Sequence, residues 1–186
     1  MTVPLTAFRR LLRSPVGYQN INVELNLLPD FALAPFVESD LAELVVLQRC
    51  CWVQEAILND TLNIPALHES AAEVLEWTTK WVVLCVRRRD RLVAAVRARP
   101  DGDAWEIGRL MVAPDLAGKG IGRWLLGRAE ALAPTTVSSF RLYTGRNSIR
   151  NIRIYQRAGY HLVEPPAGVD GHIQGAVLLV KPTTPY

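Results

Sequence analysis

The chain has 186 residues, of which 49% are hydrophobic and 21% are charged, with 21 lysines and arginines against 18 aspartates and glutamates. This length and apolar content predict one globular domain that buries a core without disulfides or a structural metal. They exclude disordered, collagen-like and low-complexity classes of protein. The cysteines Cys50, Cys51 and Cys85 include no CxxC pair, which favours a reduced, cytoplasmic setting.

The sequence predicts neither a membrane span nor a secretory leader. No apolar run reaches the length of about 18 residues that a membrane span requires. The N-terminal arginines follow the apolar residues, which is the reverse of a secretory leader. We therefore expect a soluble, cytoplasmic chain without a membrane partner, in which residues 1–28 form an N-terminal extension and residues 29–186 form the domain.

Charge is distributed unevenly along the chain. Residues 1–85 carry five basic and ten acidic side chains, whereas residues 86–186 carry sixteen basic and eight acidic ones. The basic half is expected either to face the phosphates of a small cofactor or simply to solvate a helix with its arginines. The interleaved aromatic residues typical of nucleic-acid modules are missing, so we expect no nucleic-acid partner.

The first half of the domain predicts a strand, two helices and then three strands. Asp40 with Glu43, and Ser70 with Glu73, have the spacing of capping boxes that open helices. Turn residues separate the apolar runs that follow. The predicted elements are a strand at 31–37, a helix at 40–57, a helix from about 70, and antiparallel strands at 81–87, 91–98 and 105–112.

The second half alternates helices with strands. A glycine-rich stretch leads into a helix that Pro134 ends, and a later helix places Ile149, Ile152 and Tyr155 on its buried side. Strands are predicted at 140–144, 160–163 and 176–180. The strand, helix and strand over 105–144 imply one parallel pair in a mixed, otherwise antiparallel sheet, which makes the fold class α/β (α+β).

The most informative stretch is the turn after the third antiparallel strand, where Gly118, Gly120 and Gly122 alternate just before a helix. Backbone N–H groups converge at such a turn, and the helix dipole adds positive charge, so the turn predicts a site for an anion. A dinucleotide-binding GxGxxG loop would need glycine at Arg123, and an ATP-binding P-loop would need serine or threonine at Gly120. Both of these loops are therefore disfavoured.

Two motifs resemble those of the GNAT superfamily of N-acetyltransferases. Residues 105–127 (WEIGRLMVAPDLAGKGIGRWLLG) resemble its cofactor-binding motif, with the match at Ala117–Gly122, although alanine stands where the family carries glutamine or arginine. Asn151, Tyr155 and the sequence at 158–160 resemble a second family pattern. The resemblance covers roughly residues 30–182. It implies a sheet that splays between its fourth and fifth core strands, with acetyl-CoA as co-substrate in the split and no metal.

The resemblance also implies which residues bind acetyl-CoA. Backbone groups at the end of the fourth strand would contact the pantetheine arm and the reacting oxygen, and the glycine turn would contact the diphosphate. The implied cofactor-binding residues are Leu110, Met111, Val112, Ala117, Gly118, Lys119, Gly120, Ile121, Gly122, Arg123 and Asn151.

Transfer of an acyl group to an amine needs a base and an acid. Glu106 is the candidate base, because some GNAT enzymes carry a catalytic glutamate at this separation from the motif; otherwise it is an ordinary strand carboxylate. Tyr155 is the candidate acid for the departing thiolate, and otherwise packs in the core. We interpret Cys50 and Cys51 as core residues, because no histidine motif accompanies them. The scattered histidines predict no metal site.

These observations predict an acyl-CoA-dependent N-acyltransferase, most simply an N-acetyltransferase. Its acceptor is a small-molecule amine or a protein amino group, and a homodimer is compatible with the resemblance. Acidic residues of the first half, including Glu38, Glu55, Asp60 and Glu69, are expected to form a negative rim that attracts a cationic amine. The alternative is a protein that binds coenzyme A without transferring an acyl group.

Overall fold

The structure is a computed structural model that describes residues 30–164 and 175–183. The expected extension at 1–28 lies outside the described residues. The elements are β1 (Phe31–Pro35), α3 (Leu41–Leu58), α4 (Pro65–His68), α5 (Ala71–Lys80), β2 (Val82–Arg88), β3 (Arg91–Asp101), β4 (Ala104–Val112), α6 (Ile121–Ala131), β5 (Ser139–Gly145), α7 (Ile149–Arg157), β6 (His161–Val163) and β7 (Ala176–Pro182). The short helix α4 was not predicted. The other elements occur in the predicted order.

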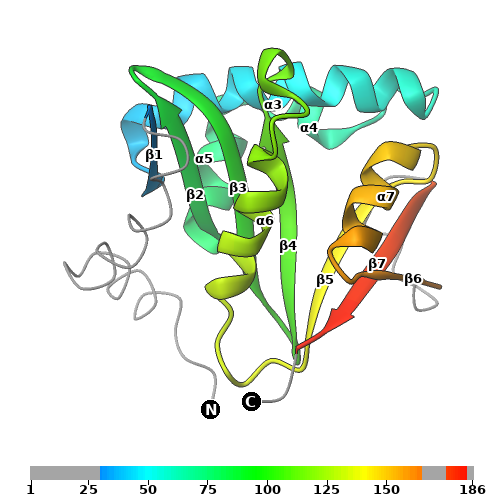
Figure 1. Ribbon diagram of the computed structural model, residues 1–186. Coiled ribbons are helices and arrows are strands. Elements are labelled where there is room, and N and C mark those ends of the chain that lie inside the picture. The colour runs from blue at the N-terminus through cyan, green and yellow to red at the C-terminus, as the bar shows by residue number, and fades with distance from the viewer. Residues whose placement is uncertain (1–29, 165–174, 184–186) are drawn as a thin grey trace.

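The described residues form a seven-stranded sheet in the order β1-β2-β3-β4-β5-β7-β6 (Figure 1). All neighbouring strands are antiparallel except β4 and β5, which confirms the predicted parallel pair and the mixed fold class. The last two strands in the chain exchange places in space, because β7 lies between β5 and β6.

The parallel pair is short, and the sheet opens beyond it. Register between β4 and β5 extends only from Ala104 opposite Ser139 to Glu106 opposite Arg141. After that point β4 continues to Val112 and β5 continues to Gly145 without pairing to each other. Figure 1 shows the two strands diverging, so the predicted splay of the sheet is confirmed.

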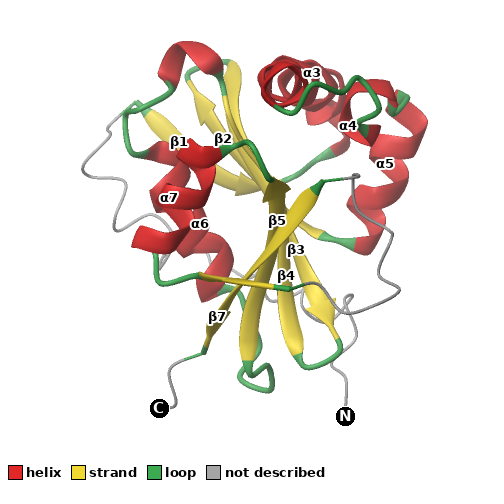
Figure 2. Cartoon of the chain, turned by 90° about the vertical axis from the view of Figure 1, so that its right-hand side faces the viewer, coloured by secondary structure: helices red, strands yellow, loops and turns green. Residues whose placement is uncertain are grey.

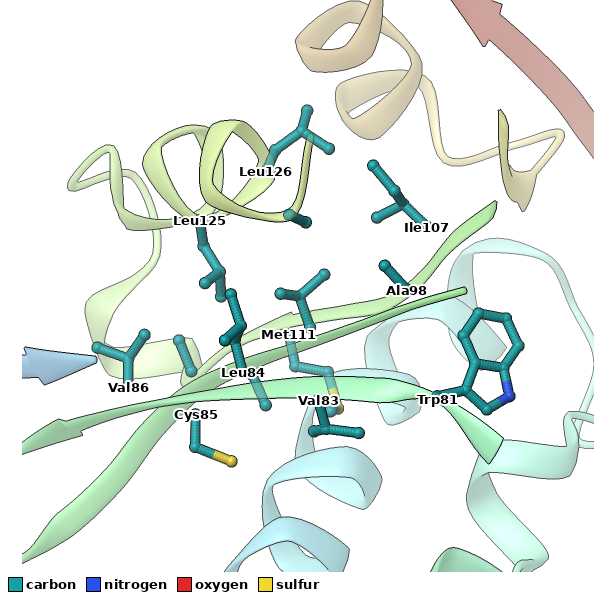
Figure 3. Close-up of a cluster of buried hydrophobic side chains, with 14 of the residues drawn as sticks. Trp81, Val83, Leu84, Cys85, Val86, Ala98, Ile107, Met111, Leu125 and Leu126 are labelled. Carbon is teal, nitrogen blue, oxygen red and sulfur yellow. The ribbon is translucent and has the colours of Figure 1, made fainter. Parts of the chain in front are cut away.

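Helices cover both faces of this sheet. Figure 2 shows α3, α4 and α5 on one face and α6 and α7 on the other. Residues 82–86 of β2 are buried without interruption, as expected of a strand that is covered on both faces. In Figure 3, Leu84 and Val86 point to the side of α6, where Leu125 and Leu126 lie, while Val83 and Cys85 point to the opposite side.

One of the two predicted capping boxes is present, and the other is wrong. The Glu73 N–H donates to Ser70 Oγ at 3.3 Å, and the Ser70 N–H donates to Glu73 Oε2 at 2.7 Å, so this box opens α5 as predicted. Asp40 instead accepts from the Val37 N–H at 3.1 Å and from Arg87, while Glu43 accepts from the Leu92 N–H at 2.9 Å. Asp40 thus bonds to the turn that precedes α3 and to β2, and Glu43 bonds to β3, so the two do not form a capping box with each other.

The buried side of α7 differs from the prediction at one residue. Ile152 is buried and Tyr155 is partly buried, as predicted, but Ile149 is 51% exposed. Ile149 is the first residue of α7 and lies where β5 has already diverged from β4, so the prediction of its burial was wrong. Gly159 adopts φ +92° after the last turn, which confirms it as the left-handed cap.

A partly buried carboxylate joins the two halves of the split sheet. Glu130, on α6, accepts from the Tyr160 hydroxyl at 2.9 Å and from Lys181 Nζ, on β7, at 2.7 Å. Tyr160 is fully buried. Burial, and the Glu130 carboxylate next to it, raise the pKa of the Tyr160 phenol.

This contact predicts that Tyr160→Phe is destabilising in a pH-dependent way. Loss of the hydroxyl should lower the free energy of unfolding by about 1–2 kcal/mol at pH 7. In the folded wild type the phenol stays neutral, whereas in the unfolded chain it ionises near pH 10. The contribution of Tyr160 is therefore complete below about pH 10 and falls above it.

Chemical denaturation of both proteins at pH 7 and at pH 10.5 measures this effect. The difference in the free energy of unfolding between wild type and Tyr160→Phe should be smaller at the higher pH. A difference that stays the same or increases would contradict the stabilising role of the neutral Tyr160 phenol.

Candidate functional site

The glycine turn joins the end of β4 to the start of α6. A 3-10 turn at Pro114–Leu116 follows the strand, and Gly118 and Gly120 then adopt φ +83° and φ +82°. Only glycine occupies this left-handed region without a steric cost, which explains both glycines. Gly120 is the N-cap residue of α6, and no side chain caps the helix.

The N–H groups of this turn are open. In the described part of the chain, no acceptor takes the N–H groups of residues 118–123, and the first helical bond runs from the Trp124 N–H to the Gly120 carbonyl at 3.0 Å. The Ala117 N–H differs, because it donates to the Pro114 carbonyl at 3.2 Å. The available donors therefore begin at Gly118, and they lie at the positive end of an 11-residue helix.

Basic side chains surround the open donors. Lys119 and Arg123 are exposed, and Arg150 Nη2, on α7, lies 3.7 Å from the position that a Cβ on Gly118 would occupy. A cavity of about 260 Å³ lies between α6 and α7 farther along the same face, with Arg123 and Arg157 among its lining residues. These residues fit a diphosphate, because they combine directed N–H donors with mobile cations.

A β-bulge in β4 marks the edge of the split. Arg97 pairs with Gly108 and Ala95 pairs with Met111, so Arg109 and Leu110 together oppose one residue of β3. Arg109 has φ +50°, which a residue with a side chain adopts at a cost. The bulge lies beyond the last pair with β5, so Leu110, Met111 and Val112 line the open edge, where we expected backbone contacts to the cofactor.

Tyr155 faces the core of the second half of the sheet. Its ring packs edge to face against Tyr160, with centroids 6.2 Å apart. Burial, and secondarily the charge of Glu55, raise the pKa of Tyr155, so the phenol is neutral at physiological pH. In the residues that the structure describes, the Tyr155 hydroxyl forms no hydrogen bond, which leaves its proton available to a ligand.

Asn151, the second candidate on α7, is held by a residue that the sequence analysis did not connect with it. Its Nδ2 donates to Glu55 Oε1, on α3, at 2.8 Å, and Ser148 Oγ also donates to Glu55. Asn59 adds a hydrogen bond to the N–H of Asn147 at 3.1 Å. The C-terminal end of α3 is thus bonded to the start of α7 across the split, through residues about 90 positions apart that no local pattern links.

Glu106 lies at the narrow end of the split, and its side chain is 6% exposed. Its Oε2 accepts from Arg99 Nε at 2.9 Å and from Arg99 Nη2 at 2.8 Å. Glu106 is also the last residue of β4 that pairs with β5. The candidate base is therefore close to the point where the two strands part, and a guanidinium partner holds it.

A group of arginines near Glu106 was not expected from the sequence. Arg109 Nη2 donates to Glu69 Oε1 at 2.6 Å, and its guanidinium lies over the Trp52 ring, 5.0 Å from the centroid. Glu69 also accepts from Gln48 Nε2 at 2.9 Å. Glu55 and Glu69, which we expected to form a negative rim for a cationic amine, are thus both engaged with neighbouring side chains.

Other kinds of site have no basis in the described residues. Burial raises the pKa of the Cys51 thiol to about 11 and also raises that of Cys85, so neither is an activated nucleophile. Cys50 is exposed, so its prediction as a core residue was wrong. No group of three or more metal-binding side chains occurs in residues 30–164 and 175–183. Within the same residues, every helix is too short or too polar to cross a bilayer.

The chain matches a known protein family over most of the described domain. Residues 44–160 match the model of the acetyltransferase (GNAT) family. This match covers well over half of the 186 residues, and the chain therefore belongs to the GNAT acetyltransferase family. A comparison with curated protein sequences gives no significant match.

Solved structures share the fold at low sequence identity. The PaiA N-acetyltransferase from Thermoplasma acidophilum, in complex with coenzyme A, has a TM-score of 0.68 at 17% identity, over 82% of this chain and 99% of that chain. The ribosomal-protein-S18-alanine N-acetyltransferase from Escherichia coli has a TM-score of 0.64 at 14% identity, over 84% and 96%. YncA from Salmonella typhimurium, solved with its cofactor acetyl-CoA, has a TM-score of 0.62 at 16% identity, over 84% and 96%.

The ion pair between Arg109 and Glu69 generates a prediction about stability. Their side chains are 10% and 17% exposed, so Arg109→Met leaves a largely buried carboxylate without its charge partner. The free energy of unfolding should fall by about 3 kcal/mol. Arg88→Met is the matched control, because Arg88 and Asp30 are 43% and 50% exposed, and it should cost less than about 1 kcal/mol. Urea denaturation of both variants measures the difference, and equal losses would contradict the structural role of Arg109.

Proposed function

We propose that this protein transfers the acetyl group of acetyl-CoA to a primary amine by direct attack of the amine on the thioester. The observation that carries the proposal is the row of open N–H groups at residues 118–123, placed beside a split that Tyr155 and the β4 bulge border. Family membership supports acyl transfer. Two of the similar structures were solved with coenzyme A or acetyl-CoA, which supports the choice of co-substrate.

Acetyl-CoA would supply an activated thioester. The protein would bind both the diphosphate and the pantetheine arm of this co-substrate. The N–H groups from Gly118 to Arg123 bind the diphosphate, and Lys119, Arg123 and Arg150 neutralise the remaining phosphate charge. The open edge of β4 at Leu110–Val112 binds the pantetheine arm. Asn151 also contacts the pantetheine arm, through the amide groups that are not bonded to Glu55.

The amine must lose a proton before it attacks. A primary amine with a pKa near 10.4 is neutral in only about one molecule in a few thousand at pH 7, a handicap of roughly 4–5 kcal/mol. We assign Glu106 as the base that receives this proton, directly or through one water. Its two bonds to Arg99 fix the carboxylate in place at the narrow end of the split.

Two further groups stabilise the charge that develops during transfer. Backbone N–H groups of the β4 bulge, at Leu110 or Met111, would meet the negative charge on the thioester oxygen. Tyr155 would donate a hydrogen bond to the departing sulfur. Because burial raises its pKa, full transfer of its proton before bond cleavage is uphill, so its help belongs to the transition state.

A thiol-release assay with acetyl-CoA and a panel of primary amines tests this function. Free thiol and acetylated amine should appear in equal amounts. The competing hypothesis is binding of coenzyme A without transfer, which the hold of Arg99 on Glu106 favours. Calorimetric binding of acetyl-CoA without thiol release from any amine, including peptide N-termini, would support that alternative and overturn the proposal.

Gly120→Ala tests the glycine turn against a control with the same strain. Gly120 and Gly102 both have left-handed backbones, at φ +82° and φ +61°, and a Cβ at either would meet nothing within 4 Å. Both substitutions to alanine should cost about 1 kcal/mol of stability. Only Gly120→Ala should weaken coenzyme A binding, by about tenfold, because it disturbs N–H groups that contact a charged ligand. Calorimetry that finds equal affinities for the two variants would contradict the proposed contact.

Tyr155→Phe tests the proposed acid. The ring keeps its packing against Tyr160, so the affinity for coenzyme A should change less than about threefold, a difference below 1 kcal/mol. The turnover number should fall by about 100-fold, because a positioned proton donor is lost. Steady-state kinetics with a saturating amine measures this. Unchanged turnover would assign Tyr155 to packing alone.

A further inference from the structure

Four arginine side chains gather on the α3 and α5 face of the sheet, near the narrow end of the split. Arg97 and Arg99 lie on β3 opposite Gly108 and Glu106, and Arg141 lies on β5 opposite Glu106, so these side chains share one face. Arg109 turns to the same face, where it contacts α3. Three of the four have carboxylate partners: Arg99 with Glu106, Arg109 with Glu69 and Arg141 with Asp101.

Arg97 is the arginine of this group that has no carboxylate partner in the described residues. Its guanidinium lies over two indole rings, 4.8 Å from the centroid of Trp77 and 4.1 Å from that of Trp81. Its Nε is buried and has no hydrogen-bond partner in the part of the chain that the structure describes. A buried cationic donor without an acceptor is costly, so binding of an anion to Arg97 would be favourable.

The electrostatic surroundings agree with this geometry. Burial, and then the positive charge of Arg109, lower the pKa of Arg97 to about 9, although the charges of Glu69 and Glu106 act in the opposite direction. Arg97 therefore remains cationic at pH 7, although its charged form is destabilised. An anion bound to Arg97 would stabilise the charged form of the guanidinium against the repulsion from Arg109.

Arg97 also lies beside the route to the split. Its Nε is 3.4 Å from the position that a Cβ on Gly108 would occupy. Gly108 is two residues beyond Glu106, where pairing with β5 has ended, so the guanidinium lies next to the open edge of β4. The glycine turn serves the opposite face, with α6 and α7 (Figure 2). An acceptor that enters from the side of α3 and α5 would meet Arg97 close to Glu106.

We propose that the acceptor is a primary amine that also carries a carboxylate, and that Arg97 binds this carboxylate while the amine reaches Glu106. The inference rests on the proposed acetyl transfer and specifies its substrate class. The two indole rings hold the guanidinium in place, and a guanidinium presents parallel N–H groups that match the two oxygens of a carboxylate. A cationic polyamine fits this face less well, because Glu55, Glu69 and Glu106 already have partners.

The first experiment compares alanine and linear ω-amino acids with their primary amides in the thiol-release assay. Each pair keeps the amine and the carbon chain and differs in the charge of the far end. For the chain length that fits best, kcat/KM should be at least about tenfold higher for the acid than for the amide, since a charge-assisted hydrogen bond is worth about 1.5–3 kcal/mol. Amides that react as well as their acids would overturn the inference.

The second experiment uses variants. Arg97→Gln should raise the KM of the acid and leave kcat/KM of the amide nearly unchanged, so the preference for the acid is lost. Arg97→Lys should keep part of that preference. Arg88→Gln is the matched control, because Arg88 also lies over an aromatic ring, that of Phe31, but on the outer part of the sheet. It should leave both rates unchanged. If Arg97→Gln does not fold, the comparison of acid and amide in the wild type still decides the matter.

A binding measurement separates this inference from the proposed function. Titration of the wild type with the same amino acids in the presence of coenzyme A, which has no acetyl group to transfer, should change the tryptophan fluorescence, because Trp77 and Trp81 contact Arg97. Arg97→Gln should show no such change. Carboxylate binding without acetyl transfer would overturn the proposed function alone, whereas transfer that ignores the carboxylate would overturn the inference alone.

Discussion

The separation of β4 from β5 is the constraint on which the rest of the structure depends. The two strands pair over Ala104–Glu106 only, and the bulge at Arg109 then turns β4 away from a partner it would otherwise continue to bind. An unpaired strand edge inside a domain is costly unless other groups use it. The open edge is maintained by bonds across the split, from Glu55 to Asn151 and from Glu130 to Tyr160 and Lys181.

This separation gives the two faces of the sheet different chemistry. On the face of α6 and α7, backbone N–H groups and mobile cations suit a phosphorylated cofactor. Backbone N–H groups are the same in almost every residue, so binding there depends little on which side chains are present. On the face of α3 and α5, side chains decide what binds. Arginines and tryptophans from β3, β4 and α5 lie there, with each carboxylate in the group already neutralised by a neighbour. A shared cofactor with a variable acceptor would follow from this division.

Local patterns in the sequence were enough for the fold and for the conformation of the glycine turn. The glycine turn, the capping residues Ser70 and Glu73, and the left-handed Gly159 depend on neighbours within a few positions, and such features can be predicted from sequence. The errors have another origin. Asp40 was paired with Glu43 in a capping box, but Asp40 bonds to Val37 in the preceding turn and to Arg87, and Glu43 bonds to Leu92. The contacts of Glu55 and Arg97 likewise join segments that only the folded chain brings together.

The most direct test of the account is a crystal structure of the protein grown with coenzyme A. We predict density for the diphosphate within hydrogen-bonding distance of the N–H groups at residues 118–123, with the pantetheine arm running along Leu110–Val112 into the split. Coenzyme A bound elsewhere on the surface, or a glycine turn closed by other parts of the chain, would contradict it.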